Sequence, residues 1–137
     1  MEYFLDTWFL IAEFNRFDSH HVRARRLRAS LGKALLVTHD GVLTEFLTFF
    51  AEMGRANRTR AAQVVRRLAL ESRMAVVPAD RSLFIDALNL YEARPDKEYS
   101  LVDCMSMTLM KQRGITHVLT NDHHFAQEGF VVLSDAP

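Results

Sequence analysis

The sequence has little of the residues that mark disulfide-rich, disordered or membrane-spanning chains. Its 137 residues include a single cysteine, Cys104, which excludes an internal disulfide and a cysteine-based metal cluster. Three prolines and five glycines are too few for a low-complexity chain. No apolar run approaches the roughly 20 residues of a membrane span, and the start MEYFLDTWFLIAEF lacks the basic segment of a secretory signal. We therefore expect one globular domain over residues 1–137, located in the cytoplasm and without a membrane segment.

The net charge is zero, but the charges are unevenly distributed along the chain. Residues 16–73 hold 12 basic and 5 acidic residues, a net +7, whereas residues 1–15 carry −3 and residues 74–137 carry −4. Two interpretations are open: solvated helix faces, or a positive surface beside an acidic pocket. Arginine outnumbers lysine 14 to 3, a bias that suits the recognition of phosphate.

Short apolar runs alternate with helical patterns along nearly the whole chain. The predicted strands are Tyr3–Leu5, Leu35–Thr38, Met74–Pro78, Thr116–Thr120 and Phe130–Leu133. The predicted helices are 7–15, His20–Lys33, His39–Met53, Thr59–Ser72, 80–94, Ser100–Gln112 and His123–Gln127. This alternation predicts an α/β fold with a parallel sheet covered by helices on both faces. Ligands of such sheets bind beyond the carboxyl ends of the strands, where the strand order reverses.

Two aspartates follow predicted strands. Asp6 comes directly after the first strand, and Asp122 follows the fourth strand in the segment VLTNDHHF. Each could simply cap the next helix, a contribution of about 1 kcal/mol. Alternatively, the two acids could belong to a ligand site, because both lie at the carboxyl edge of the same sheet, where ligands bind. Both interpretations stay open for each residue taken alone.

Asp103 and Glu45 add two acids from helices. Asp103 lies in SLVDCMSMTLMKQ, a helix that is apolar around almost its whole circumference and is therefore expected to be buried. It could form a capping box with Ser100, or face a cation where an uncompensated carboxylate would cost several kcal/mol. Glu45 lies at the edge of an apolar helix face, so its position alone favours a side chain that reaches water. That predicted apolar face consists of Val42, Leu43, Phe46, Phe49, Phe50 and Met53.

Four acids from four separate segments suit a hard divalent cation, Mg²⁺ or Mn²⁺. Such an ion binds carboxylates together with substrate phosphate oxygens and activates a water. The pair His123–His124 is not predicted to chelate a metal, because adjacent helical residues point about 100° apart. Hydrogen bonding at the first helical turn, or contact with a phosphate, is the favoured interpretation of these histidines.

Five segments carry a resemblance to a known family: FLDTWFLIAEFN, DSHHVRA, VTHDGVLTEF, YSLVDCMSMTLMKQRGI and VLTNDHHFAQEGFVVL. In the same order, and over nearly the whole chain, they resemble the PIN domain, a metal-dependent ribonuclease fold that includes the VapC-type toxins of toxin–antitoxin pairs. The last two segments are the most specific. The resemblance implies a parallel sheet of five strands in the order 3-2-1-4-5, with Asp6 beside Asp122.

The resemblance also implies roles for individual residues. The acids that hold one or two Mg²⁺ or Mn²⁺ ions and direct water onto an RNA phosphodiester fall on Asp6, Glu45, Asp103 and Asp122. Thr7 and Thr120 match polar positions that support these acids, and Asn121 matches a position that is variably polar. Trp8 departs from the small polar residue found in many relatives, a difference that bears on the shape of the pocket.

The partners that the resemblance implies are an RNA substrate, an antitoxin that places a basic group in the acidic pocket, and a second copy of the chain in a homodimer. We hypothesise that one of two arginine groups lines the path of single-stranded RNA. The arginines concerned are Arg23, Arg26, Arg55, Arg58 and Arg60. The alternative function is that of a non-catalytic or housekeeping RNA-binding PIN domain.

Overall fold

The computed structural model describes residues 1–134, within which the chain forms five strands and seven helices. The strands are β1 (Glu2–Leu5), β2 (Leu35–His39), β3 (Met74–Val77), β4 (His117–Leu119) and β5 (Val131–Leu133). The helices are α1 (Thr7–Phe14), α2 (His21–Ser30), α3 (Asp40–Phe50), α4 (Arg55–Leu68), α5 (Arg81–Ala93), α6 (Leu101–Arg113) and α7 (His124–Gln127). The prediction of one domain extends to residues 135–137, which lie outside the described part of the chain.

The strands form one sheet in the order β3-β2-β1-β4-β5, and every neighbouring pair is parallel. The predicted fold class and strand order are therefore confirmed. β1 is the central strand, with Phe4 opposite Val37 of β2 on one side and Val118 of β4 on the other. The chain adds β2 and β3 on one side of β1 and then returns to add β4 and β5 on the other. The carboxyl end of β1 is thus the switch point at which ligands bind in open sheets.

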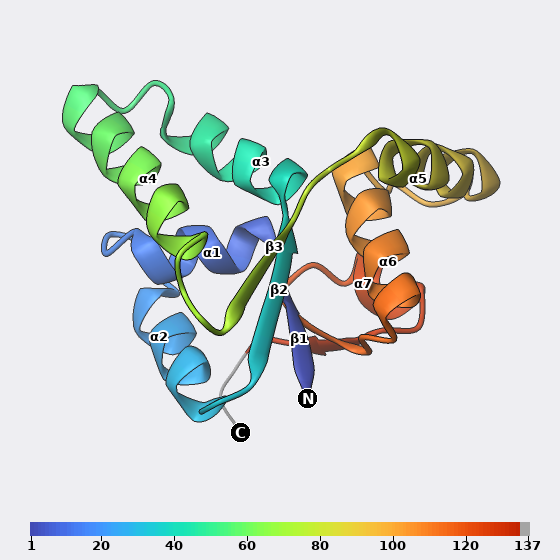
Figure 1. The fold of residues 1–137 in the computed structure, drawn as a ribbon, viewed down its shortest axis with the longest axis horizontal. Helices are drawn as coiled ribbons and strands as arrows, with labels where there is room; N and C mark the ends of the chain where they lie inside the picture. Colours follow the sequence, from blue (N-terminus) through green and yellow to red (C-terminus); the bar gives the residue numbers. More distant parts are fainter. Residues whose placement is uncertain (135–137) are drawn as a thin grey trace.

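The helices divide into two layers on the two faces of the sheet (Figure 1). Figure 1 views the sheet close to its edge, with α1 to α4 on the left and α5 to α7 on the right. Crossover connections between parallel strands are right-handed. The chain builds the sheet in one direction from β1 to β3 and in the opposite direction from β4 to β5, so the helices before and after β3 cover opposite faces. β2 and β3 end in the upper half of the view, where α3 and α5 begin.

The core consists of the apolar strand runs and the helix faces packed against them. Phe4 and Leu5 of β1 are fully buried, as is expected of a central strand covered on both faces. In α6, Cys104, Met107 and Met110 are fully buried. The prediction of a buried helix in this segment is confirmed for all but its two ends, where the first turn is half-buried and the last residues are exposed. Among the helices of residues 1–134, none has both the length and the apolar character needed to cross a membrane.

Two predictions about the helices between β2 and β3 were wrong. Phe49 and Met53 are 41% and 43% exposed, so they do not belong to the buried face that Phe46 and Phe50 form. The next helix begins at Arg55 and not at Thr59, because Gly54 turns the chain with φ at +86°, a conformation open to glycine. Thr59 lies inside α4 and caps nothing.

Candidate active site

The end of β1 lies beside the end of β4, and one threonine connects the two aspartates found there. The backbone N–H of Asp6 donates to the carbonyl of Leu119, which continues the pairing of the two strands by one residue. Thr120 is fully buried; its hydroxyl donates to Asp6 Oδ2 at 2.7 Å and accepts from the backbone N–H of Asp122 at 3.1 Å. Asp6 occupies the N-cap position of α1, but its side chain makes no capping hydrogen bond. Its carboxylate is instead turned toward β4.

A second threonine connects α1 to α3. The hydroxyl of Thr7, the first residue of α1, donates to Glu45 Oε1 at 2.6 Å across 38 residues of sequence. The position of Glu45 along the helix favours a side chain that reaches water. In the structure the residue is instead half-buried and accepts this hydrogen bond. By contrast Glu52, seven residues further along the chain, is exposed. The packing of α3 against α1 thus brings this acid to the carboxyl edge of the sheet.

Asp103 serves as a helix cap and also faces the acids. Ser100 accepts from the backbone N–H of Asp103, and Asp103 Oδ2 accepts from the backbone N–H of Ser100, so the capping box is present. The Asp103 side chain is 15% exposed. Asp122 is held in a similar way, because its Oδ1 accepts from the backbone N–H of His124 at 2.9 Å. In both residues one oxygen makes a local hydrogen bond while the carboxylate lines the hollow. The cap interpretation is confirmed for Asp103, whereas His123 and not Asp122 occupies the N-cap position of α7.

One hollow of about 460 Å³ contains all four acids. Its lining residues are Asp6, Thr7, Ile11, Glu45, Thr48, Phe49, Asp103 and Asp122. The lining thus includes four carboxylates and, among the residues that the structure describes, no lysine or arginine. Each carboxylate has one oxygen oriented by a donor of the chain. The arrangement therefore directs negative charge into the hollow without using both oxygens of any acid.

Burial makes this concentration of carboxylates unfavourable without a cation. Burial raises the pKa of Asp6 to about 7, with the charges of Asp103 and Glu45 adding to the effect and the Thr120 hydrogen bond opposing it. Burial also raises the pKa of Glu45 and that of Asp103, each with a neighbouring carboxylate contributing. Carboxylates that are difficult to ionise together are a mark of functional sites, and a divalent cation would offset their repulsion.

The donor set fits a divalent cation. Hard cations take carboxylate oxygens, and the hollow offers these from four elements of the fold. Asp103, Asp122 and His124 each place one donor atom within 4.8 Å of the others. The Nδ1 atom of His124 is buried and has no hydrogen-bond partner, although it lies 3.2 Å from Asp122 Oδ1. An orphaned buried nitrogen beside two carboxylates is the local feature that a bound cation would resolve.

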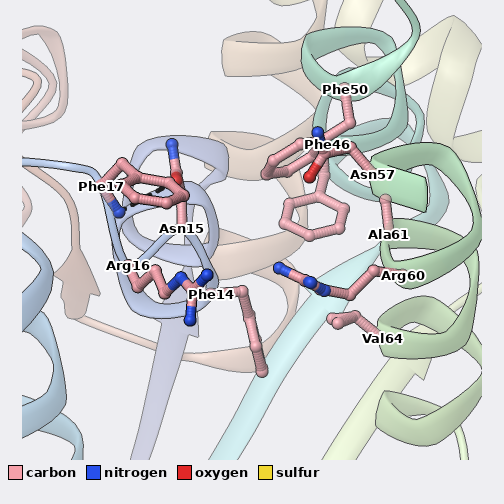
Figure 2. A pocket seen from close by; sticks show the side chains of 10 residues that line it. All are labelled: Phe14, Asn15, Arg16, Phe17, Phe46, Phe50, Asn57, Arg60, Ala61 and Val64. Atoms are coloured by element: carbon pink, nitrogen blue, oxygen red, sulfur yellow. Dashed lines mark hydrogen bonds between the residues drawn. The ribbon is translucent and has the colours of Figure 1, made fainter. Parts of the chain in front are cut away.

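The predicted arginines lie at different distances from this hollow. Arg58 lines a second hollow between α3 and α4, of about 660 Å³, which meets the acidic one at Thr48. Arg60 instead extends from α4 into a small apolar hollow beside Phe14 and Phe46 (Figure 2), so the structure does not bring it to the acids. Arg55 is exposed at the start of α4.

Arg23 and Arg26 lie on α2, which runs toward the amino ends of the strands (Figure 1). They line none of these hollows.

Three residues that line the hollow were not predicted as site residues: Ile11, Thr48 and Phe49. Neither was His124, which lies beside two of the acids. His124 was given only a first-turn or phosphate role, yet it lies 3.9 Å from Asp103 Oδ2. Phe49 was assigned to the core, and Thr48 was given no role. Helical spacing is the signal in the sequence that points to Thr48 and Phe49, because they follow Glu45 by three and four residues on the same side of α3. Asn121, predicted to support the acids, is exposed, and no hydrogen bond joins it to them in the described part of the chain.

Comparisons with known proteins agree with this fold. The family model described as "PIN domain" matches residues 3–130. The chain is 31% identical over 128 residues to the "23S rRNA-specific endonuclease VapC20" of Mycobacterium tuberculosis, a match covering 93% of this chain and 95% of that protein. The crystal structure of VapC20 from Mycobacterium tuberculosis, a toxin that cleaves the sarcin–ricin loop, is similar with a TM-score of 0.83 and 30% identity, covering 94% of this chain and 96% of the other. DNA-bound VapBC from Salmonella typhimurium is similar in fold, with a TM-score of 0.68, 20% identity and 97% of each chain covered.

Proposed function

This chain belongs to the PIN domain family, and on that premise we propose that it is an endoribonuclease, the toxin of a type II toxin–antitoxin pair. Its activity would be hydrolysis of RNA phosphodiester bonds with Mg²⁺ or Mn²⁺. The observation that carries the proposal is the meeting of four carboxylates from four elements in one hollow at the switch point of the sheet. The four residues proposed as catalytic and metal-holding are Asp6, Glu45, Asp103 and Asp122.

The chain's own residues prepare the hollow for a phosphodiester and a cation. Thr120 and Thr7 orient Asp6 and Glu45. The backbone N–H groups of Ser100 and His124 orient the other two acids. When a divalent cation is bound, it supplies Lewis-acid activation of water and neutralises charge on the phosphate. Without a cation, the carboxylates would repel a phosphodiester, and this repulsion is the physical reason to expect that cleavage requires metal.

Ribosomal RNA is the first substrate to test. The relative named as specific for 23S rRNA aligns with 93% of this chain, and the family model spans residues 3–130, a range that includes all four acids of the proposed site. We propose that the present chain also acts on ribosomal RNA. The antitoxin and the homodimer stay predictions, which co-expression with a neighbouring open reading frame and sedimentation of the purified chain would test. The cytoplasmic location also stays a prediction, which cell fractionation would test.

The test is cleavage of total RNA and of intact ribosomes by the purified chain in Mg²⁺, in Mn²⁺ and in excess EDTA, with the cut ends mapped. Glu45→Gln and Glu52→Gln form a matched pair, because both acids belong to the same stretch of chain but only Glu45 lines the hollow. We expect Glu45→Gln, Asp6→Asn and Asp103→Asn each to lower the cleavage rate at least about 100-fold, since each removes transition-state stabilisation worth several kcal/mol. Glu52→Gln should cleave as the parent chain does. Tight RNA binding with no cleavage of any substrate would favour the non-catalytic alternative.

A further inference from the structure

His124 lies beside Asp103 and Asp122, two of the acids that line the hollow, with one ring nitrogen close to both. Its Nδ1 atom is 3.2 Å from Asp122 Oδ1 and 3.9 Å from Asp103 Oδ2. The side chain is 20% exposed, but Nδ1 itself is buried. The ring is held by an edge contact with Tyr99, with ring centroids 5.6 Å apart. The nitrogen therefore has a fixed place beside Asp103 and Asp122.

This nitrogen lacks a hydrogen-bond partner. Within residues 1–134, two buried side-chain nitrogens or oxygens are left unpaired, and they are His20 Nδ1 and His124 Nδ1. Leaving a buried polar atom unpaired costs about 1–3 kcal/mol, so it calls for an explanation. His20 packs against Trp8 and belongs to no group of metal-ligating side chains among the described residues. His124 is the unpaired histidine that belongs to such a group, with Asp103 and Asp122.

Two of the three distances between the donor atoms fit one coordination sphere. Metal–ligand distances of about 2.1 Å place ligand atoms in adjacent octahedral positions about 3 Å apart and in opposite positions about 4 Å apart. The distance of 3.2 Å from Nδ1 to Asp122 corresponds to adjacent positions, and the distance of 3.9 Å to Asp103 lies within the upper limit. The nitrogen can therefore share one ion with either carboxylate, and all three donor atoms lie within 4.8 Å of one another.

We propose that His124 Nδ1 is a direct ligand of the divalent cation, together with Asp103 and Asp122, and that it makes this site prefer Mn²⁺ to Mg²⁺. The inference rests on the proposed function for the presence of a cation, and it adds a nitrogen ligand to the four acids. Imidazole suits first-row transition metals, whereas Mg²⁺ prefers oxygen ligands and binds nitrogen poorly. His123 is not part of this ligand set: it is exposed, and its ring only packs beside that of His124 with centroids 4.8 Å apart.

The structure supplies a clean set of variants. His124→Ala removes the nitrogen but keeps the backbone N–H that orients Asp122, so the carboxylate should stay in place. His124→Asn places an amide oxygen near the position of Nδ1 and so exchanges a nitrogen donor for a hard oxygen donor. His123→Ala is the matched control, because it removes the neighbouring exposed imidazole. Thermal melts of all variants check that the chain stays folded.

The experiment measures binding of Mn²⁺ and of Mg²⁺ to the metal-free full-length chain by calorimetry, without RNA. The parent chain and His123→Ala should bind Mn²⁺ at least about tenfold more tightly than Mg²⁺. His124→Ala should lose at least about tenfold in Mn²⁺ affinity with a much smaller loss for Mg²⁺. His124→Asn should retain Mg²⁺ binding and lose the preference for Mn²⁺. Equal losses for both ions in His124→Ala, or no loss for either, would overturn the proposal.

A spectroscopic readout distinguishes a ligand from a residue that merely orients its neighbours. Electron spin echo modulation of bound Mn²⁺ reports nitrogen in direct coordination. The nitrogen signal should be present in the parent chain and in His123→Ala, and absent in His124→Ala; its absence from the parent chain contradicts the assignment. Because these measurements contain no RNA, they separate the two proposals. Manganese bound through His124 in a chain that cleaves no RNA would refute the proposed function alone, whereas metal-dependent cleavage without the nitrogen signal would refute this inference alone.

Discussion

Asp6 is the residue at which the needs of the site conflict most directly with the stability of the fold. Its side chain is only 6% exposed, and burial raises its pKa to about 7. In the unfolded chain an aspartate titrates near pH 3.9. Between these two pH values the folded state binds the extra proton, so stability falls as the pH rises from about 4 to about 7. Above pH 7 the full destabilisation is present unless a cation compensates for it.

Replacing Asp6 by Asn should therefore stabilise the metal-free chain at high pH. Asparagine keeps the shape of the side chain and an acceptor for Thr120, but it carries no charge. We expect the free energy of unfolding in EDTA at pH 8 to rise by on the order of 3 kcal/mol, with little change at pH 4. Urea denaturation at the two pH values provides the measurement. Asp96→Asn, which changes an exposed aspartate, should show neither effect; an Asp6→Asn variant no more stable than the parent at pH 8 would contradict the argument.

At the scale of elements, a buried histidine fixes the start of α3 against α6. His39 Nδ1 accepts from the backbone N–H of Gly41, and Nε2 lies 2.8 Å from the hydroxyl of Ser106. Because that hydroxyl donates to the carbonyl of Val102, Nε2–H is the donor to Ser106, and the ring is neutral. A Cβ on residue 41 would lie 2.8 Å from the histidine ring, so only glycine fits there. This contact helps to hold Glu45 of α3 in a fixed relation to Asp103 of α6.

The neutral histidine predicts a pH effect opposite in sign to that of Asp6. Burial lowers the pKa of His39 to about 4, whereas the unfolded chain protonates near 6.5. The unfolded state binds the extra proton between these values, so stability is lost as the pH falls from about 6.5 to about 4. His39→Asn keeps an N-cap acceptor for Gly41 and removes this titration. We expect the parent to lose on the order of 2–3 kcal/mol more than His39→Asn between pH 7 and pH 4.5.

Urea denaturation in an Asp6→Asn background measures this difference without the opposing titration of the aspartate. His123→Asn, at an exposed position, should leave the pH dependence unchanged. If His39→Asn loses as much stability on acidification as its parent, then His39 is not the group responsible.

At the scale of the whole molecule, opposite charges are placed in two adjoining hollows. The acidic hollow and the hollow between α3 and α4 share Thr48, and the second hollow is lined by Arg58 and Arg66. A strand of RNA with its scissile phosphate at the acids would meet these two arginines along α3. Helix α2, which carries Arg26, runs toward the amino ends of the strands, away from the carboxyl ends (Figure 1). Of the two arginine groups weighed from the sequence, the geometry favours the one on α4.

Charge reversal at the two groups should separate their effects on RNA binding. In a Glu45→Gln background, in which we expect cleavage to be at least about 100-fold slower, Arg58→Glu with Arg66→Glu should weaken binding of a single-stranded RNA at least about tenfold in 0.1 M salt. The slope of log affinity against log salt should become shallower by about 1–2. Arg23→Glu with Arg26→Glu makes the same change in net charge on α2 and should have a much smaller effect. Fluorescence anisotropy at several salt concentrations measures the RNA affinity of each variant. Equal losses of affinity in both double variants would show a response to net charge alone and would contradict an RNA path along α3.

Much of the fold and part of the site follow from local patterns in the sequence. The apolar runs and the helical periodicity predicted all five strands of the described chain to within about two residues at each end. The capping box of Ser100 and Asp103 was visible as a four-residue motif because its two hydrogen bonds are local. Asp6 is predicted as a site residue because it directly follows a buried strand and the carboxyl ends of parallel strands define the binding edge, and the structure places it in the lining of the hollow. The order of the strands came from family resemblance and not from spacing.

What the sequence by itself determined was which side of its own element each residue faces; the tertiary structure decided which neighbour lies on that side. Glu45 and Phe49 share one face of α3, but only the packing of α3 beside α1 turns that face toward the hollow and leaves Phe49 exposed. His124 follows Asp122 by two residues, yet its nearness to Asp103 depends on how α7 packs against α6. Such contacts join residues distant in sequence through hydrogen bonds and packing, and no local periodicity encodes them.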